Sequence, residues 1–241
     1  MGAALTPFTA RAHVFVVDLD APRLADDDHH HLARVLRLGP GAEVTVGDGA
    51  GRWRPGRLTD GPDVEPTGDV VADPRPSPPV TVAFALAKGD RPELTVQKLT
   101  ELGVDRMVPF TAERSVVRWE GAKAGRQVAR LTEIARQAAM QSRRTWLPVV
   151  DPLVSFAVAS TLPGSALADR DGDPPSLARP TVLVGPEGGW APAERAAGLP
   201  AVRIATLVLR AETAAITIGA VLTAIRAEIV AESQSVDTPR S

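Results

Sequence analysis

The chain has 241 residues, a formal net charge of -2 and no cysteine, so disulfides and cysteine metal sites are excluded. Its 27 basic and 29 acidic side chains nearly balance, which gives no general sign of a nucleic-acid-binding protein. No apolar stretch is long enough to span a membrane, and no basic-then-apolar leader begins the chain. We expect a cytoplasmic protein with no membrane partner and no metal site.

Residues 1–73 have the pattern of a small β-rich domain. The expected elements are a strand at 13–17, a helix at 28–36 capped by one of the preceding aspartates, a strand at 43–48 and a return strand at 52–58. Asp48 and Gly49 begin the hairpin between the last two strands. Pro55 favours an edge position for the return strand, and alternation places Trp53 in the core.

A proline-rich segment follows the β-rich domain. Four prolines fall within the seven residues from Asp73 to Pro79. Such a composition is typical of a stiff linker. Residues 74–79 are therefore the predicted domain boundary.

Strands and helices alternate through residues 80–231, which predicts an α/β domain with a mostly parallel sheet. The expected strands are 80–87, 106–110, 165–168, 181–184 and 202–205. The expected helices are 92–102, 125–142, 152–160 and 212–231, with a surface loop at 169–180. Residues 232–241 are polar and are predicted to be a disordered tail.

Two strand-end loops stand out near the C-terminus. The strand Thr181–Val184 runs into Gly185-Pro186-Glu187-Gly188-Gly189, and the segment after the next strand contains Leu209-Arg210-Ala211-Glu212-Thr213-Ala214. In open α/β sheets, ligands bind at glycine-rich turns that follow the strands. A single glycine turn is more often an ordinary turn, but two such loops about twenty residues apart favour a binding site.

This pair of loops resembles the RsmE family of SPOUT methyltransferases. The family methylates N3 of a uridine in 16S small-subunit ribosomal RNA with S-adenosylmethionine. The resemblance extends to the segments His31–Gly41, Lys88–Arg91 and Gln97–Val104. It implies a trefoil-knotted α/β methyltransferase domain with an N-terminal PUA-like β-barrel domain. It also implies a homodimer whose substrate is small-subunit ribosomal RNA within the assembled or assembling 30S subunit.

The resemblance assigns roles to residues of the two loops. Arg210 and Glu212 are the implied catalytic residues, with Arg210 stabilising charge and the general base left unassigned. The implied cofactor-binding residues are Leu183, Val184, Gly185, Pro186, Glu187, Gly188, Gly189, Ile204, Ala205, Leu209, Thr213 and Ala214. The chain departs from the family pattern at Ala205, Leu207 and Met140, where the family has glycine, arginine and glutamate.

Six arginines are candidate RNA ligands, because guanidinium groups pair with phosphates and stack on bases and because the family resemblance implies RNA contact by these segments. They are Arg34, Arg37, Arg114, Arg118, Arg143 and Arg144. Arg34 and Arg37 are three residues apart and are predicted to share one helix face. A solvated polar surface is the alternative for this pair, and favourable contact with the helix dipole is the alternative for Arg143 and Arg144.

Two other functions remain open. The first is a different SPOUT RNA methyltransferase that acts on tRNA or on a ribose 2'-hydroxyl. The second is a non-catalytic RNA-binding assembly protein with a degenerate pocket, which Ala205 and Leu207 keep possible. Lys98 and Glu101 have the spacing of an ordinary surface ion pair on one helix.

Overall fold

The computed structural model describes residues 5–232, so the expected tail lies outside the described residues except for Glu232. The chain divides into two compact units. The first contains the described residues up to Pro76 together with Arg136–Leu147, and the second contains Ser77–Ala135 and the described residues from Pro148 onward. None of the described helices is long and apolar enough to cross a membrane.

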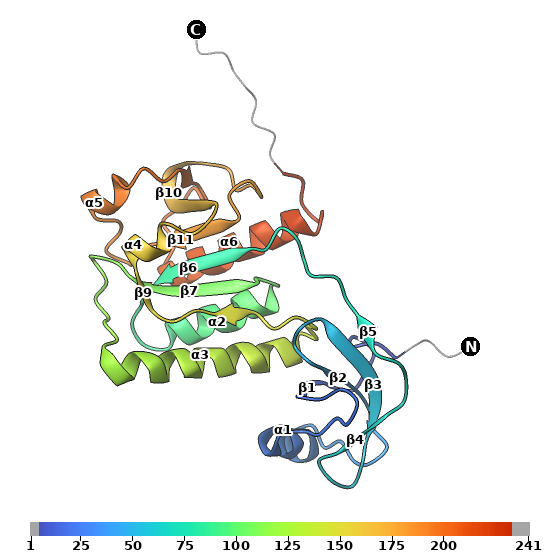
Figure 1. The fold of residues 1–241 in the computed structure, drawn as a ribbon. Helices are drawn as coiled ribbons and strands as arrows, with labels where there is room; N and C mark the ends of the chain where they lie inside the picture. Colours follow the sequence, from blue (N-terminus) through green and yellow to red (C-terminus); the bar gives the residue numbers. More distant parts are fainter. Residues whose placement is uncertain (1–4, 233–241) are drawn as a thin grey trace. The chain divides into compact units, whose positions relative to one another are not determined.

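The first unit is built on a five-stranded mixed sheet (Figure 1). Its elements are β1 (His13–Phe15), α1 (Asp26–His30), a π-helix (His31–Val35), β2 (Glu43–Gly47), β3 (Arg52–Leu58), β4 (Val64–Pro66) and β5 (Val71–Ala72). β1 pairs parallel to β2, and β3 pairs antiparallel to β2, β4 and β5. Val14, Val44, Val46 and Leu32 form its buried core.

The expected edge position of Pro55 is wrong, because β3 has partners on both sides. β4 pairs with Gly56–Leu58 and β5 pairs with Arg52 and Trp53. Pro55 lies in the gap between these two partners, where proline removes no ladder hydrogen bond on that side. Trp53 is buried, as the alternation predicts.

The expected shared helix face of Arg34 and Arg37 is also wrong. The helical segment ends at Val35, and Arg37 has a left-handed backbone with φ of 54°. The side chains of both residues are exposed. Ala25, rather than an aspartate, occupies the N-cap position, and the carboxylate of Asp28 instead accepts two hydrogen bonds from Arg136.

The Asp48–Gly51 turn packs against the end of Arg136–Leu147, the second stretch of chain in this unit. Gly51 donates to the Thr145 carbonyl at 3.0 Å, and Leu147 donates to the Gly49 carbonyl at 2.9 Å. A Cβ on Gly51 would lie 2.3 Å from the Trp146 ring, and one on Gly49 would lie 2.6 Å from Leu147. The two glycines therefore allow a contact that no larger residue could make.

The second unit is a seven-stranded sheet in which every pairing is parallel (Figure 1). Its strands are β6 (Thr81–Ala85), β7 (Arg106–Thr111), β8 (Val149–Val150), β9 (Val154–Ser155), β10 (Ser165–Asp173), β11 (Thr181–Val184) and β12 (Ala201–Val202). Its helices are α2 (Arg91–Glu101), α3 (Gly121–Gln141, which ends in the first unit), α4 (Phe156–Ala159), α5 (Pro192–Arg195) and α6 (Ala211–Arg226). The predicted α/β class is confirmed.

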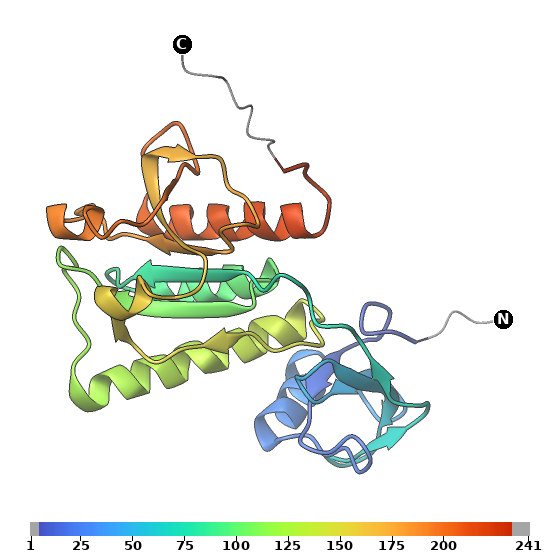
Figure 2. The same ribbon diagram turned by 45° about the horizontal axis from the view of Figure 1, so that its top comes forward.

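Alternate residues of the strands face two different cores. Val82 and Phe84 pack with α2, α6 and the first part of α3 on one face. Figure 2 shows α6, in red, running alongside the sheet. Ala83 and Ala85 pack on the other face with α4 and Trp190. Strands covered on both faces read as continuous apolar runs, which is the pattern that predicted them.

Several predicted boundaries differ from the structure. Part of the expected loop at 169–180 continues β10 to Asp173, because Asp173 pairs with Val202 across a bulge. β12 ends at Val202, earlier than expected. The expected helix 152–160 is β9 followed by the short α4. α6 ends at Arg226, and Glu228 beyond it has a left-handed φ of 57°.

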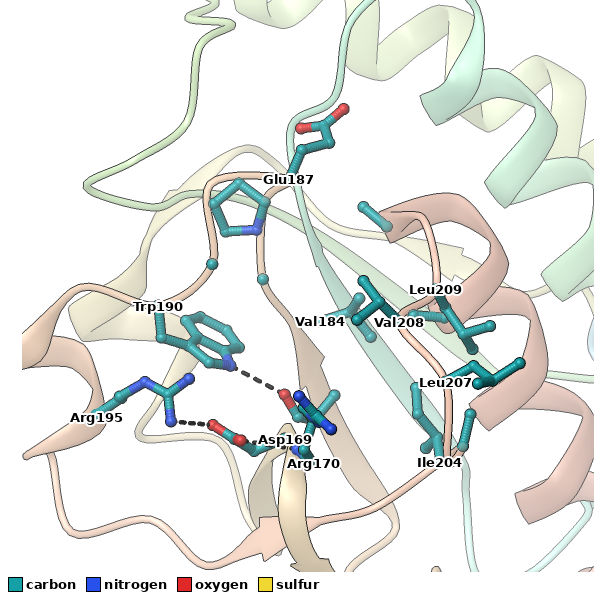
Figure 3. Close-up of a pocket in the computed structure, with 17 residues that line it drawn as sticks. Asp169, Arg170, Val184, Glu187, Trp190, Arg195, Ile204, Leu207, Val208 and Leu209 are labelled. Carbon is teal, nitrogen blue, oxygen red and sulfur yellow. Dashed lines mark hydrogen bonds and ion pairs between the residues drawn. The ribbon is translucent and has the colours of Figure 1, made fainter.

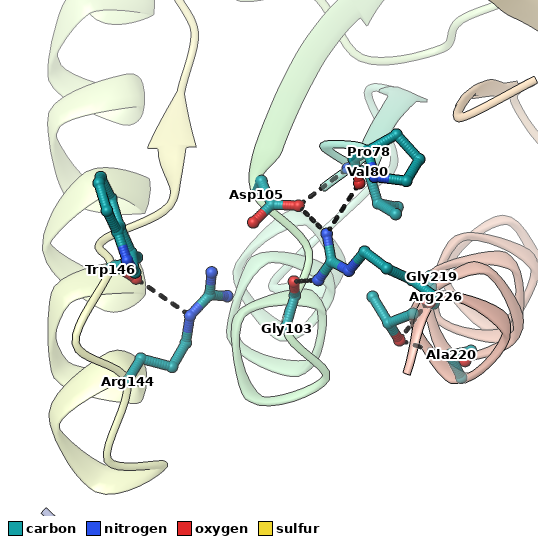
Figure 4. Close-up of polar contacts among 10 residues, drawn as sticks. Pro78, Val80, Gly103, Asp105, Arg144, Trp146, Gly219, Ala220 and Arg226 are labelled. Carbon is teal, nitrogen blue, oxygen red and sulfur yellow. Dashed lines mark hydrogen bonds and ion pairs between the residues drawn. The ribbon is translucent and has the colours of Figure 1, made fainter. Parts of the chain in front are cut away.

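The end of α6 is joined to the sheet by a buried ion pair (Figure 4). Arg226 pairs with Asp105, and their side chains are 11% and 8% exposed. Arg226 also donates to the Gly103 carbonyl at 2.8 Å, and Asp105 accepts from the Val80 amide at 2.8 Å. This network joins the helix to the starts of β6 and β7.

Replacing Asp105 by alanine should lower the free energy of unfolding by about 3 kcal/mol, because it leaves Arg226 buried without its carboxylate. Urea denaturation followed by circular dichroism measures this. Lys98→Ala is the control, since it removes a partly exposed pair on α2 and should change stability by less than about 0.5 kcal/mol. Equal losses in the two variants would contradict the structural role of Asp105.

His13 should make the first unit sensitive to acid. Burial, and secondarily the charge of Arg143, lower the His13 pKa from 6.5 to about 4. The unfolded chain binds a proton below pH 6.5 whereas the folded chain resists it until about pH 4, so stability falls as the pH drops through this window. The full loss is on the order of 3 kcal/mol.

Urea midpoints between pH 7 and pH 4 measure this loss, with His13→Asn as the comparison. The variant should be less stable at pH 7 and should show a smaller decline toward pH 4. An unchanged pH dependence in the variant would exclude His13 as the source.

Candidate active site

A cavity of about 230 Å³ lies beside the middle of β10, beyond the carboxyl end of β11 and beside the start of α6 (Figure 3). Three chain segments line it. Their residues come from the middle of β10, from the first loop and α5, and from the second loop and the first turn of α6. The lining residues are Ala168, Asp169, Arg170, Val184, Gly185, Pro186, Glu187, Gly189, Trp190, Arg195, Ile204, Ala205, Leu207, Val208, Leu209, Ala211 and Ala214.

The first loop follows β11 and turns tightly. The Gly189 amide donates to the Pro186 carbonyl at 2.8 Å, and Gly189 has a left-handed φ of 69° that a side chain would strain. A Cβ on Gly185 would lie 3.0 to 3.3 Å from the Trp190 ring. Both glycines are therefore required by the turn and its packing.

The second loop runs from β12 to α6 and gives the cavity an apolar side. Ile204 and Leu209 pack partly against the main core, whereas Leu207 and Val208 are 78% and 84% exposed. Arg210 is the N-cap residue of α6, with an extended backbone. Exposed aliphatic side chains beside a cavity are typical of a surface that is covered by a ligand or a partner.

The remaining side of the cavity is fixed by polar contacts of Trp190 and Asp169. Trp190 donates from Nε1 to the Ala168 carbonyl at 3.0 Å and stacks on Phe110 with ring centroids 6.1 Å apart. Asp169, whose side chain is 12% exposed, pairs with Arg195 at 2.5 Å. Figure 3 shows this ion pair beneath the tryptophan. These contacts set the position of β10 relative to the first loop.

Comparison with known proteins decides the family. The family model of the RNA methyltransferase domain matches residues 74–223, and that of the RNA methyltransferase PUA domain matches residues 24–63. The chain is 35% identical over 218 residues to the ribosomal RNA small subunit methyltransferase E of Mycobacterium tuberculosis, covering 81% of this chain and 83% of that one. The corresponding protein of Synechocystis is 32% identical, with 77% and 67% covered.

The chain belongs to the RsmE family of RNA methyltransferases. Among solved structures, the ribosomal RNA small subunit methyltransferase E of Neisseria gonorrhoeae, bound to S-adenosyl methionine, superposes with a TM-score of 0.74 at 28% identity. The superposition covers 89% of this chain and 97% of that one. The predicted fold class and family are confirmed, while the trefoil knot stays a prediction.

Most of the cofactor residues that the RsmE resemblance implied line the cavity. Those that line it are Val184, Gly185, Pro186, Glu187, Gly189, Ile204, Ala205, Leu209 and Ala214. Leu183 is fully buried in the core behind the sheet edge, Gly188 lies against Arg114, and Thr213 is exposed on α6. A Cβ on Gly188 would meet the Arg114 Cβ at 3.1 Å, so Gly188 accommodates a neighbouring loop.

The two implied catalytic residues of the RsmE family lie on either side of Ala211. The Arg210 side chain is exposed and makes no hydrogen bond or ion pair with the described residues. The Glu212 side chain is 11% exposed, and its Oε1 is 3.6 Å from Arg91 Nε. Its Oε2 is buried without a hydrogen-bond partner in the described part of the chain.

The six arginines proposed to contact RNA have different environments. In the second unit, Arg114 donates to the Gly188 carbonyl at 3.3 Å beside the first loop, and Arg118 is exposed. In the first unit, Arg143 donates to the Arg11 carbonyl at 3.0 Å, and burial lowers its pKa. Arg144 donates to the Trp146 carbonyl at 3.1 Å, so both of these arginines also have structural contacts.

Sequence reasoning missed several residues around the cavity. Ala168, Asp169 and Arg170 belong to the segment predicted as a strand end and a surface loop, and Arg195 follows the motif on α5. Trp190 directly follows the Gly185–Gly189 turn, and its size beside two glycines is a signal that could have identified it. Three residues differ from the family pattern. Met140 packs against the core of the first unit, and Ala205 and Leu207 line the cavity.

Proposed function

We propose that this protein transfers a methyl group from S-adenosylmethionine to N3 of a uridine in 16S small-subunit ribosomal RNA, in the cytoplasm. The observation that carries the proposal is the cavity between the two strand-end loops, in a chain that matches RsmE relatives over most of its length. The names of these relatives support a small-subunit RNA substrate, and the family resemblance supports uridine N3 and the 30S context.

The cavity suits the cofactor chemically. Val184, Ile204 and Leu209 offer apolar surface for a flat nucleoside base, and the glycines of the first loop expose backbone groups for hydrogen bonds. The Ala205 methyl group adds bulk where the family has glycine. When bound, S-adenosylmethionine supplies an electrophilic methyl group on a sulfonium.

The protein has to orient the acceptor, exclude water and favour loss of the uracil N3 proton. We assign charge stabilisation to Arg210, because its guanidinium is exposed, unpaired among the described residues and next to the cavity-lining Leu209. Glu212 retains an oxygen without a partner in the described residues and is the nearby carboxylate that could accept a proton after a change of rotamer. The general base stays unassigned.

The direct test is mass spectrometry of small-subunit ribosomal RNA from a strain that lacks this protein. Loss of one N3-methyluridine, restored by the purified enzyme with S-adenosylmethionine, would support the proposal. A lost methyl group on a ribose or on tRNA would support the first alternative. No lost methyl group and no cofactor binding by calorimetry would support the non-catalytic alternative.

Arg210→Ala should lower the single-turnover methylation rate by a factor on the order of 10², because it removes a charge aimed at the transition state. Its free side chain predicts little change in stability. Replacing both Arg34 and Arg37 by alanine should instead weaken RNA binding, reduce its salt slope by about two and leave cofactor affinity unchanged.

These variants are compared by filter binding and single-turnover methylation across a salt series. Arg23→Ala is the control for the first unit, since Arg23 already pairs with Asp63 at 2.8 Å. Unchanged methylation of bound RNA by Arg210→Ala, or an unchanged salt slope in the double variant, would refute the assigned roles.

We also propose a symmetric homodimer. The exposed Leu207 and Val208 beside the cavity, and Ile229 at 78% exposure after α6, provide apolar surface for a second copy. Light scattering should give about twice the chain mass of 25.3 kDa. A stable and active monomer would contradict this proposal.

A further inference from the structure

Arg91 contacts residues from both loops that line the cavity. It is the first residue of α2, which follows β6 after a turn at Gly89 with φ of 72°. Its Nη1 donates to Glu187 Oε1 at 2.6 Å, and its Nε lies 3.6 Å from Glu212 Oε1. Glu187 belongs to the first loop, and Glu212 belongs to the first turn of α6, where the second loop ends.

The geometry makes Arg91 the cation between two carboxylates of like charge. Glu187 points away from Asp169 and Arg195, the other ion pair of the cavity, as Figure 3 shows. Without a cation between them, Glu187 and Glu212 would repel each other, and the two loops would tend to separate. A guanidinium group suits this position because its planar fork can engage two acceptors in different directions.

The contact is more buried than a surface ion pair, so its loss costs more free energy. The side chains of Arg91 and Glu187 are 32% and 34% exposed, and that of Glu212 is 11% exposed. Since Glu212 Oε2 already lacks a hydrogen-bond partner within residues 5–232, loss of Arg91 would leave a largely buried carboxylate without its cation. Such a group is strongly unfavourable and would have to move.

We propose that Arg91 is a positioning residue of the methyl-transfer site, which fixes the spacing of the two cavity loops through Glu187 and Glu212. The inference rests on the proposed function for its effect on the cofactor. The effect on the loops is independent of the ligand. Two measurements therefore distinguish the effect of Arg91 on the loops from its effect on cofactor binding.

Hydrogen–deuterium exchange of the ligand-free protein measures the loops directly. In Arg91→Ala, the amides of residues 185–190 and of residues 204–211 should exchange faster than in the unmodified protein. The exchange of β7 should stay unchanged. Lys98→Ala is the matched control, because it removes one positive charge from the same helix and, among residues 5–232, breaks the pair with Glu101.

Calorimetry with S-adenosylmethionine measures the consequence for the site. Arg91→Ala should raise the Kd about tenfold, and Arg91→Lys should give an intermediate value because an ammonium lacks the planar fork. Glu187→Gln should weaken binding, and adding it to Arg91→Ala should cause less further loss than it causes alone, since the two residues act through one contact. A general loss of stability would not produce this non-additive pattern.

Wild-type exchange in both loops of Arg91→Ala would overturn the inference, as would a Kd within twofold of the unmodified protein or fully additive losses. If the unmodified protein does not bind S-adenosylmethionine, the proposed function fails. The exchange data then decide the role of Arg91 by themselves, because faster exchange in both loops would support it and unchanged exchange would reject it.

Discussion

The parallel direction of every strand in the second unit is the constraint on which its site depends. Two neighbouring parallel strands cannot be joined by a tight turn. The chain therefore runs back to the other end of the sheet before each new strand begins. The carboxyl ends of the strands consequently meet at one edge. The two loops that carry the family motifs leave β11 and β12 at this edge, and β10 lies between these two strands in the sheet.

Parallel strands bring the segments together, and side-chain contacts then fix the shape of the cavity. Trp190 fills the space above Gly185 and donates to the Ala168 carbonyl, while Asp169 and Arg195 join β10 to α5. Arg91 contacts both glutamates on the other side. The site therefore depends on a few partly buried polar contacts and on glycines that permit close packing.

The arginines show why charge alone is a weak guide to function. Arg136, Arg143 and Arg226 each bond to groups within their own unit, with Asp28, the Arg11 carbonyl and Asp105 as partners. A guanidinium in such a contact stabilises the folded protein, and this role explains its presence without RNA binding. Arg210 differs, because its side chain is exposed and has no partner among the described residues.

The sequence by itself predicted the α/β class and the parallel sheet, and the family resemblance named nine of the residues that line the cavity. Continuous apolar runs and the turn at Gly185–Gly189 are local patterns that the sequence shows directly, whereas the site residues were implied by the resemblance to the RsmE family. Strand ends and irregular strand pairings were harder to predict from the sequence. Asp173 and Val202 pair across a bulge within an Asp- and Gly-rich segment, which has the composition of a loop.

Only the tertiary structure decided which distant residues complete the site. Arg91 and Glu187 are 96 residues apart in the sequence, and no periodicity of the sequence connects them. Likewise, nothing in the local sequence predicts that Arg136–Leu147 joins the first unit, since this depends on Asp28 and on the glycines at 49 and 51. Local patterns specify elements, whereas long-range ion pairs and close packing exist only once those elements have met.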